Sequence, residues 1–415
     1  MKLPNFITNR STSEKWLISI FLAAAFWFYP SKGHADVMLC LVGIYGLINL
    51  PQTVACWRNP AGILFGLGVI YVLLSWTWSF YPEGTERDIA KALPMIIATF
   101  GLPAVFNTKQ RVMHALLVSA GLITIRLAFE LLRVCRDLGW PAVLAEARHH
   151  QEYLYTHPQV SSMMAGLCLL VFLAALFRGA RTGYVGVLMI AGVFLNVVYL
   201  YVMASRGAQA VLAVVCLLAP VLIMPTGRSR IVVLMLSITI GFAAWPLAKV
   251  INPRFQNERE MTNFSSRTRV WKYTLHLMES RPLLGYGFGK MVFEKAIYDN
   301  PEKTRAPRWP IKYPHAHSYW LMLYFQGGQV GAVLFGAAWL ALLARLIRSK
   351  IDNGDAKSLL DRMRARTPWA LMMCLMSYIL LYGIIDYPDH LLRHAQFFLV
   401  ALILAYTASP RASAT

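Results

Sequence analysis

The chain contains many apolar stretches long enough to cross a lipid bilayer, and they recur from about residue 16 to the C-terminus. A membrane-spanning helix needs roughly 20 predominantly apolar residues to cross the hydrocarbon core. A transmembrane β-barrel would instead show segments of alternating polarity, whereas runs such as 231–244 do not alternate. The sequence therefore predicts an all-α polytopic membrane protein with about twelve transmembrane helices, at residues 16–29, 36–51, 61–80, 90–106, 112–133, 158–177, 184–204, 207–224, 231–248, 318–347, 367–385 and 392–408.

The composition agrees with a chain that lives in lipid. Hydrophobic residues make up 57% of the 415 residues and charged residues only 14%, which is too apolar for a soluble domain with a wetted surface. The six cysteines fall mostly inside apolar runs, where a free cysteine behaves as a small hydrophobic residue. We therefore expect no disulfide framework and no metal cluster.

Lysine and arginine are distributed unevenly between the two sets of loops. If the N-terminus is cytoplasmic, the cytoplasmic loops hold most of the basic residues of the short loops, among them Arg228, Arg230, Arg345 and Arg348. This asymmetry follows the positive-inside rule, so both termini are predicted to be cytoplasmic. We expect three parts: transmembrane helices in 1–248, an outer loop subdomain in 249–317, and further transmembrane helices with a short cytoplasmic tail in 318–415.

The long outer loop departs from this charge pattern. Residues 249–316 carry 13 Lys and Arg but six Asp and Glu. Long loops cross the membrane largely regardless of charge, so the predicted topology stands. A basic surface on the outer side suggests an anionic ligand; the alternative is a soluble cap attracted to anionic lipid headgroups.

Two arginine motifs lie at the predicted outer face. In Ser205-Arg206-Gly207, a tight turn before an apolar helix, the guanidinium and the free N–H groups of the helix start favour a phosphate. The alternative is that Arg206 extends to lipid headgroups beside a helix-breaking glycine. In the long loop, Arg267 and Trp271 share one face of a predicted helix at i,i+4 spacing. Here the alternative is an ordinary amphipathic helix with Trp271 as its core anchor.

Two clusters of glycines occur in the second half of the chain. Gly285, Gly287 and Gly289 alternate, and the lack of a Cβ lets this backbone approach a ligand or another segment closely. The segment neither follows a strand nor opens a βαβ unit, so it is not a dinucleotide-binding pattern. Farther along, glycines at 327, 328 and 331 are predicted to allow close helix packing.

Two histidines, His315 and His317, stand where the long loop re-enters the membrane. Either imidazole can act as a general base near neutral pH. A second interpretation has the pair recruit Asp386 or Asp389 of the last outer turn to hold zinc or magnesium. A third treats both histidines as ordinary polar loop residues.

Together these motifs resemble those of the O-antigen ligases and the related polymerases. The matching features are the Ser205-Arg206-Gly207 turn, Arg267 with Trp271, the Pro282 to Gly289 segment, and His317-Ser318 followed by Gly328 and Gly331. The architecture is also similar, with about twelve helices and a long outer loop before the third helix from the end. The resemblance implies a GT-C-like membrane glycosyltransferase without a cofactor or a catalytic metal.

The resemblance also implies roles for particular residues. The essential histidine of the family corresponds to His317, with His315 as the alternative base, and its two essential arginines correspond to Arg206 and Arg267. An outer-loop cation of the family is matched to Arg87. The remaining candidates for substrate contact are Arg148, Tyr153, Arg269, Trp271 and Asp389.

The activity implied by the resemblance is a transfer reaction on the periplasmic face of the bacterial inner membrane. The donor is a polysaccharide on undecaprenyl pyrophosphate and the acceptor is a sugar hydroxyl of lipid A–core. Partners are therefore these two glycolipids and the inner-membrane lipids, with no nucleic acid. The chemistry of the residues agrees, because arginine stabilises a pyrophosphate leaving group by bidentate hydrogen bonds and histidine takes the hydroxyl proton. We expect a single displacement with inversion, since no carboxylate pair for retention is evident in the long loop.

Three other functions remain open. An O-antigen polymerase would share the arginines and the histidine but use another lipid-linked repeat as acceptor. A protein O-oligosaccharyltransferase usually has a larger soluble C-terminal part. From a different class, a transporter or flippase for a lipid-linked anion would place ionisable residues at mid-membrane, where this sequence offers Arg126 and Glu130 at i,i+4 spacing.

Overall fold

The computed structural model describes residues 32–146, 158–179, 183–203, 205–251, 265–298, 315–349, 358–386 and 389–408. Over these residues the chain is helical and contains no strand. The helices are α3 (Lys32–Ile48), α4 (Leu50–Trp57), α5 (Pro60–Leu74), the 3-10 helix η1 (Ser75–Trp78), α6 (Pro82–Val105), α7 (Lys109–Glu146), α8 (Pro158–Arg178), α9 (Gly183–Met203), α10 (Arg206–Ile223), α11 (Gly227–Ile251), α13 (Ser265–Met278), α14 (Lys290–Tyr298), α15 (Tyr319–Arg348), α16 (Leu359–Ile385) and α17 (Asp389–Ala408).

The predicted all-α membrane class is confirmed. In the described part of the chain, eight helices are long and apolar enough to span a bilayer, and a bent pair, Asp36–Ile48 with Leu50–Trp57, brings the number to nine if it forms one span. The two members of this pair meet at 94°. The predicted helix at 16–29 lies outside the described residues, so the count of twelve remains a prediction.

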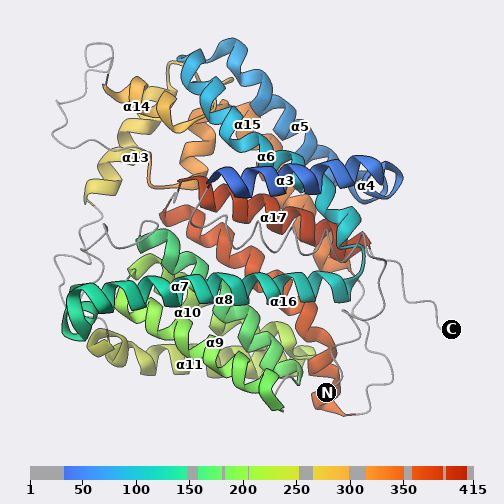
Figure 1. The fold of residues 1–415 in the computed structure, drawn as a ribbon, viewed down its shortest axis with the longest axis vertical. Helices are drawn as coiled ribbons and strands as arrows, with labels where there is room; N and C mark the ends of the chain where they lie inside the picture. The colour runs from blue at the N-terminus through green and yellow to red at the C-terminus, as the bar shows by residue number, and fades with distance from the viewer. Residues whose placement is uncertain are drawn as a thin grey trace.

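The helices form two packed groups that share α17 (Figure 1). One group contains α3, α4, α5, α6 and α15, and the other contains α7 to α11 with α16. The loop helices α13 and α14 lie together at the left side of Figure 1, whereas α4 lies at the opposite side. Because α3 and α17 run across the view between these sides, the loop helices sit at one end of the bundle.

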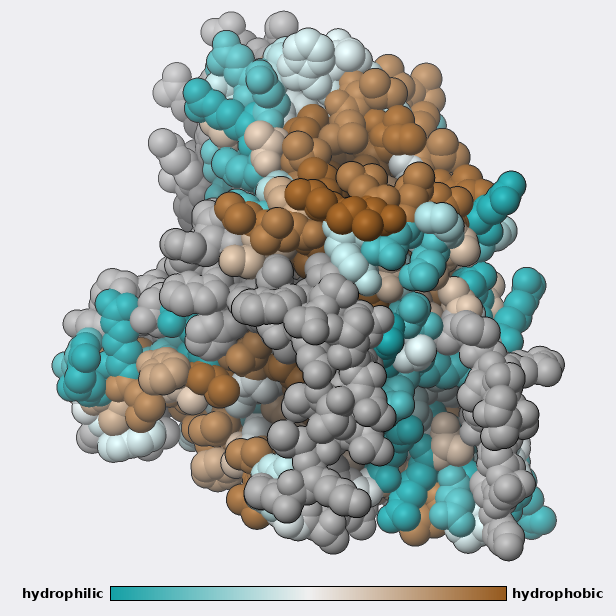
Figure 2. Space-filling view, turned by 45° about the vertical axis from the view of Figure 1, so that its right-hand side comes forward, coloured by the Kyte–Doolittle hydropathy of each residue, from teal (hydrophilic) through white to brown (hydrophobic). Residues whose placement is uncertain are grey.

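Large apolar side chains cover the outside of the bundle. In α5, for example, Ile63, Leu67, Ile70 and Leu74 are each about half exposed. Figure 2 shows apolar side chains gathered on one such face. Contiguous exposed apolar surface of this kind is unfavourable in water and is typical of a surface that contacts lipid.

Helix α15 is broken at Gly328, which has φ 59° and ψ −158°. The break interrupts the regular hydrogen-bond ladder, and residues 282–287 replace the missing partners. Tyr286 N donates to Phe325 O at 2.9 Å, and Gly287 N donates to Gln326 O at 3.0 Å. In the other direction, Gln329 N donates to Pro282 O at 2.8 Å. Backbone groups at this depth must be satisfied by the protein itself, so the loop and the break depend on each other.

The alternating glycines approach other protein segments. A Cβ added to Gly285 would lie 2.5 Å from Gly328 N, one added to Gly287 would lie 2.4 Å from Ser79 Oγ, and one added to Gly289 would lie 2.5 Å from Asp88 Oδ2. All three glycines have positive φ, which residues with side chains rarely adopt. Of the two uses left open by the sequence, close approach to another segment is the one that the structure shows.

Replacing Gly328 with alanine is expected to destabilise the protein by at least about 2 kcal/mol, because its backbone conformation is essentially restricted to glycine. A Cβ there would also lie 2.2 Å from Leu283 O. Thermal unfolding of the purified protein in detergent measures the effect. Gly336 lies in the same helix with nothing within 4 Å of an added Cβ, so Gly336→Ala is the matched control. An equal melting temperature for both variants would contradict the assigned role of Gly328.

Candidate active site

The two histidines form a short, fixed segment before α15. Ser318 is the N-cap of α15, where its side chain accepts a hydrogen bond from Leu321 N, and its hydroxyl donates to Gly383 O of α16 at 3.4 Å. Ala316, between the histidines, is fully buried. The segment is therefore anchored to two membrane helices, so the imidazoles have a defined position at the end of the bundle.

The two imidazoles differ in their hydrogen bonding. Their ring centroids are 4.3 Å apart, and His317 N donates to His315 Nδ1 at 3.2 Å. This bond requires an unprotonated Nδ1 on His315. His317 has φ 49°, an uncommon conformation for a residue with a side chain. Strained backbone of this kind persists where the surrounding structure fixes it, and it is frequent at functional sites.

Asp386, which directly follows α16, joins the histidine segment to the long loop. Its Oδ1 lies 3.4 Å from His317 Nδ1, and its Oδ2 lies 3.8 Å from Arg267 Nη2. Arg267 Nη1 also donates to Ile385 O at 2.7 Å, which satisfies a carbonyl at the end of α16. The Asp386 side chain is 4% exposed, whereas those of Arg267 and His317 are 27% and 20% exposed. The carboxylate thus lies behind two groups that reach the surface.

The contact between Asp386 and His317 fixes the orientation and the tautomer of the imidazole. When Nδ1 carries its proton toward the carboxylate, the lone pair of the neutral ring is on Nε2. A carboxylate in this position also stabilises the imidazolium that forms when Nε2 takes a proton. His317 therefore has the arrangement of an oriented general base.

Asp386 is charged at neutral pH despite its burial. Burial favours the protonated carboxyl, but the hydrogen bond from His317 and the positive charge of Arg267 outweigh it and hold the pKa of Asp386 below its usual 3.8. A carboxyl whose pKa is depressed by folding stabilises the fold at pH values above its unfolded pKa. This contribution disappears as the pH falls through the lower, folded pKa.

The Asp386→Asn variant is therefore expected to be less stable than wild type at neutral pH, with the difference shrinking as the pH falls below 3.8. Unfolding midpoints measured between neutral and acidic pH provide the test. Asp361, an exposed residue that forms a capping box with Ser358 at the start of α16, supplies the control substitution Asp361→Asn. A stability difference for Asp386→Asn that is independent of pH would show that the carboxylate is not ionised in the fold.

Arg206 is the first residue of α10, and it lies near the same end of α16. Ser205, the N-cap of α10, is buried, and a Cβ added to Gly207 would lie 2.9 Å from Ile385 Cδ1. Ile385 is also the residue whose carbonyl binds Arg267. The start of α10, the start of α13 and the histidine segment therefore meet around residues 385 and 386, although they are far apart in the sequence.

The other residues predicted to contact the substrate lie in different parts of the chain. Arg269 is exposed on α13, and Trp271 is partly exposed there, with a buried Nε1 that has no hydrogen-bond partner in the described part of the chain. Arg87 is exposed on α6, and within the described ranges it makes no hydrogen bond to the histidine segment. Arg148 and Tyr153 lie outside the described residues. Asp389 begins α17, and its side chain is not described.

Sequence reasoning did not assign a role in catalysis to Asp386. From the sequence, Asp389 is predicted to contact the substrate, and Asp386 is considered only as a metal ligand. Within the described residues, no group of three or more His, Cys, Asp and Glu side chains is arranged to hold a metal ion. The sequence feature that indicates a role for Asp386 is its position at the end of an apolar helix, because a carboxylate buried there requires a cationic partner.

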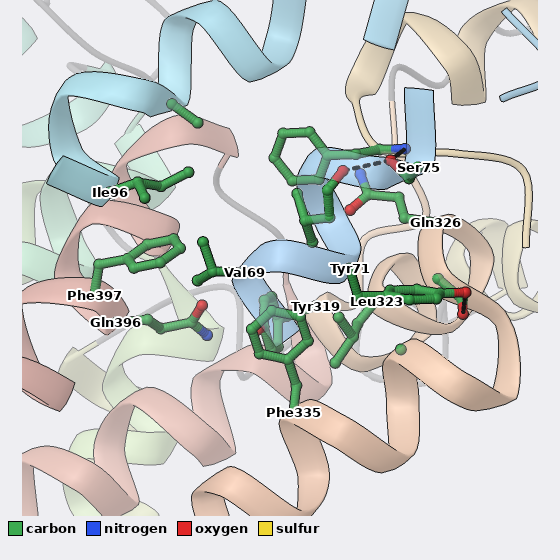
Figure 3. A pocket seen from close by; sticks show the side chains of 15 residues that line it. Val69, Tyr71, Ser75, Ile96, Tyr319, Leu323, Gln326, Phe335, Gln396 and Phe397 are labelled. Atoms are coloured by element: carbon green, nitrogen blue, oxygen red, sulfur yellow. Dashed lines mark hydrogen bonds between the residues drawn. The ribbon is translucent and has the colours of Figure 1, made fainter. Parts of the chain in front are cut away.

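A narrow cavity lies inside the bundle between α5, α6, α15 and α17 (Figure 3). Its walls are mainly apolar and include Val69, Ile96 and Phe397. Gln326 and Gln396 also line it, and neither side-chain Nε2 has a hydrogen-bond partner among the described residues. Two buried amide donors facing one cavity can hold an ordered water. The cavity is separate from the His317 and Asp386 contact described above.

The fold and the site define a polytopic helical membrane protein with a His, Asp and Arg centre at one end of its helix bundle. Residues 165–336 match the family model described as O-antigen ligase. The matched segment includes Arg206, Arg267 and His317 and ends before Asp386. The resemblance to the O-antigen ligase family is thereby confirmed, and the family supports a membrane glycosyltransferase of the O-antigen ligase or polymerase type. No curated protein matches the chain.

Proposed function

We propose that this protein is an inverting, metal-independent O-antigen ligase. It moves a polysaccharide from undecaprenyl pyrophosphate to a sugar hydroxyl of lipid A–core, at the periplasmic face of the inner membrane. The observation that carries the proposal is the His317 and Asp386 contact beside Arg267. This arrangement provides an oriented base and a cation within one site.

In the proposed reaction, the acceptor oxygen attacks the anomeric carbon of the donor sugar. The new carbon–oxygen bond forms as the bond from that carbon to the pyrophosphate oxygen breaks. The hydroxyl proton moves to His317 Nε2, and the negative charge of Asp386 stabilises the resulting imidazolium. The products are the glycosylated acceptor and undecaprenyl pyrophosphate, which leaves with the bonding electron pair.

Two arginines are proposed to stabilise the leaving group. Arg206 stands at the N-terminus of α10, where the helix dipole also favours an anion. Arg267 has one Nη committed to Ile385 O and lies 3.8 Å from Asp386, so its placement is fixed before the substrate arrives. Charge stabilisation by fixed groups is a large part of enzymatic rate enhancement.

A single displacement inverts the anomeric configuration. A retaining mechanism needs a carboxylate nucleophile that can reach the anomeric carbon. Asp386 is 4% exposed on its side chain and is oriented toward His317 and Arg267, which supports a role behind the base. The sequence also supports the proposal of substrate contacts by six further residues: Arg87, Arg148, Tyr153, Arg269, Trp271 and Asp389. On the same basis we propose the three-part division of the chain into 1–248, 249–317 and 318–415.

The buried acidic residue that a transporter would use has a structural partner. Glu130 of α7 is fully buried, and its Oε2 accepts a hydrogen bond from Tyr199 of α9 at 2.6 Å. This bond ties two helices of the same group together. The observation favours a structural role for the acidic side chain, so we prefer surface chemistry to transport.

The test is a transfer assay with purified protein, undecaprenyl-pyrophosphate glycan and lipid A–core, in the presence and absence of a chelator. Transfer to lipid A–core that persists with chelator, with the anomeric configuration inverted by NMR, is the expected result. Chain growth on the lipid carrier without transfer to core would replace the ligase assignment with a polymerase. Loss of transfer with chelator, restored by a divalent cation, would overturn the metal-independent mechanism.

A further inference from the structure

A second pocket lies at the end of the bundle opposite the histidines. It has a volume of about 470 Å³ and is formed by the start of α5, the end of α15 and the end of α17. Its lining residues are Asn59, Pro60, Ala61, Ala341, Ala344, Arg345, Arg348, Ser349 and Thr407. The pocket therefore combines two guanidinium groups with a wall of small apolar side chains.

The length of α15 separates this pocket from the candidate active site. His317 precedes the first turn of α15, whereas Arg345 and Arg348 lie in its last turn. The helix has 30 residues, which corresponds to roughly 45 Å of rise if the break at Gly328 is ignored. Both α5 and α15 belong to candidate membrane spans, so the pocket lies where these spans end, at the level of lipid headgroups.

The pocket offers positive charge without carboxylate partners. Neither Arg345 nor Arg348 forms an ion pair with an acidic side chain of the described residues. Arg345 Nε donates to Thr407 Oγ1 at 2.6 Å, which fixes this guanidinium between α15 and α17. The N-terminus of α5 adds a partial positive charge beside it, because Asn59 is the N-cap of α5.

We propose that this pocket binds the phosphate of an anionic phospholipid headgroup. Two guanidinium groups and a helix N-terminus suit a phosphodiester, and Ala341 and Ala344 leave apolar space for the start of the acyl chains. A free inorganic phosphate carries at least as much negative charge but gains nothing from the apolar wall. The proposal is independent of the catalytic function proposed above, because it uses none of the same residues.

The test measures lipid binding to the full-length protein in phosphatidylcholine nanodiscs, by native mass spectrometry during a titration with phosphatidylglycerol. Wild type is expected to retain one tightly bound phosphatidylglycerol. Arg348→Glu should weaken that binding by more than the roughly 30-fold expected from reversing one surface charge, at about fivefold for each of the two units of charge changed. Arg348 is exposed, and within the described residues its side chain makes no hydrogen bond or ion pair on which the fold depends, so this variant is expected to fold. Arg345→Lys, which keeps the charge but loses the planar fork, should weaken binding less.

Arg362→Glu is the matched control, because Arg362 is an exposed residue near the start of α16, on the same side of the bundle, that does not line the pocket. It should leave the tight site unchanged. Equal weakening by Arg348→Glu and Arg362→Glu would overturn the proposal in favour of diffuse surface charge. Equal retention of phosphatidylglycerol and phosphatidylcholine by wild type would also overturn it. Binding of inorganic phosphate in lipid-free detergent as tight as that of phosphatidylglycerol would overturn the lipid assignment.

Discussion

Replacing His317 with alanine is expected to lower the rate of glycan transfer by a factor of about 10² to 10⁴, the usual contribution of a general base. The proposed Nε2 acceptor for the hydroxyl proton is removed, while Ser318, which caps α15, is retained. The rate is measured under single-turnover conditions with saturating donor, so that proton transfer is separated from product release. Helical content and melting temperature of the variant establish that it is folded.

Two further variants distinguish the base from its surroundings. His315→Ala should reduce the rate much less, because His315 Nδ1 already accepts the backbone N–H of His317. Asp386→Asn keeps the shape of the site but no longer fixes the His317 tautomer, so it should lower kcat and change the pH profile of the reaction. Full activity of His317→Ala together with loss of activity in His315→Ala would reverse the assignment of the base.

The membrane helices were predictable because the bilayer imposes a strong and local sequence pattern. The predicted helix at 158–177 corresponds to α8, Pro158–Arg178, and the predicted helix at 207–224 corresponds to α10, Arg206–Ile223. In both cases a charged or turn-forming residue ends a predominantly apolar run. Such boundaries can be read from one segment alone, without knowledge of its neighbours.

Features that depend on distant segments could not be predicted in the same way. Gly328 lies within an apolar run that reads as one continuous helix, yet the helix is broken there because residues 282–287 supply new hydrogen-bond partners. The bend between α3 and α4 similarly divides the helix predicted at 36–51. Pro51, in the first turn of α4, was a local signal for that boundary.

The candidate site also contains contacts between distant segments, and these could not be predicted from the sequence. His317, Arg206 and Arg267 were singled out by residue type, by position at the predicted outer face and by resemblance to a family. The importance of Asp386 follows only from the structure, because its partners His317 and Arg267 are 69 and more than 100 residues away in the chain. A single sequence does not state that Asp386 is turned toward them.

Removing either proposed leaving-group arginine is expected to lower kcat by about 10² to 10³, the range seen when one fixed charge-stabilising group is lost. Arg206→Lys should recover part of the rate, because lysine keeps the charge but lacks the planar bidentate fork. The assay is the single-turnover transfer to lipid A–core, with donor binding measured separately. Lys272→Ala, an exposed basic residue of α13 outside the site, is the control for a general loss of positive charge.

The double variant Arg206→Ala with Arg267→Ala tests whether the two side chains act on the same group. If both stabilise one pyrophosphate, their effects on kcat should combine to less than the product of the single effects. Arg267 also contacts Asp386 and Ile385, so its loss should lower stability as well. Wild-type rates in both single variants would contradict a pyrophosphate donor at this site, and the basic outer loop would then require a different anionic ligand.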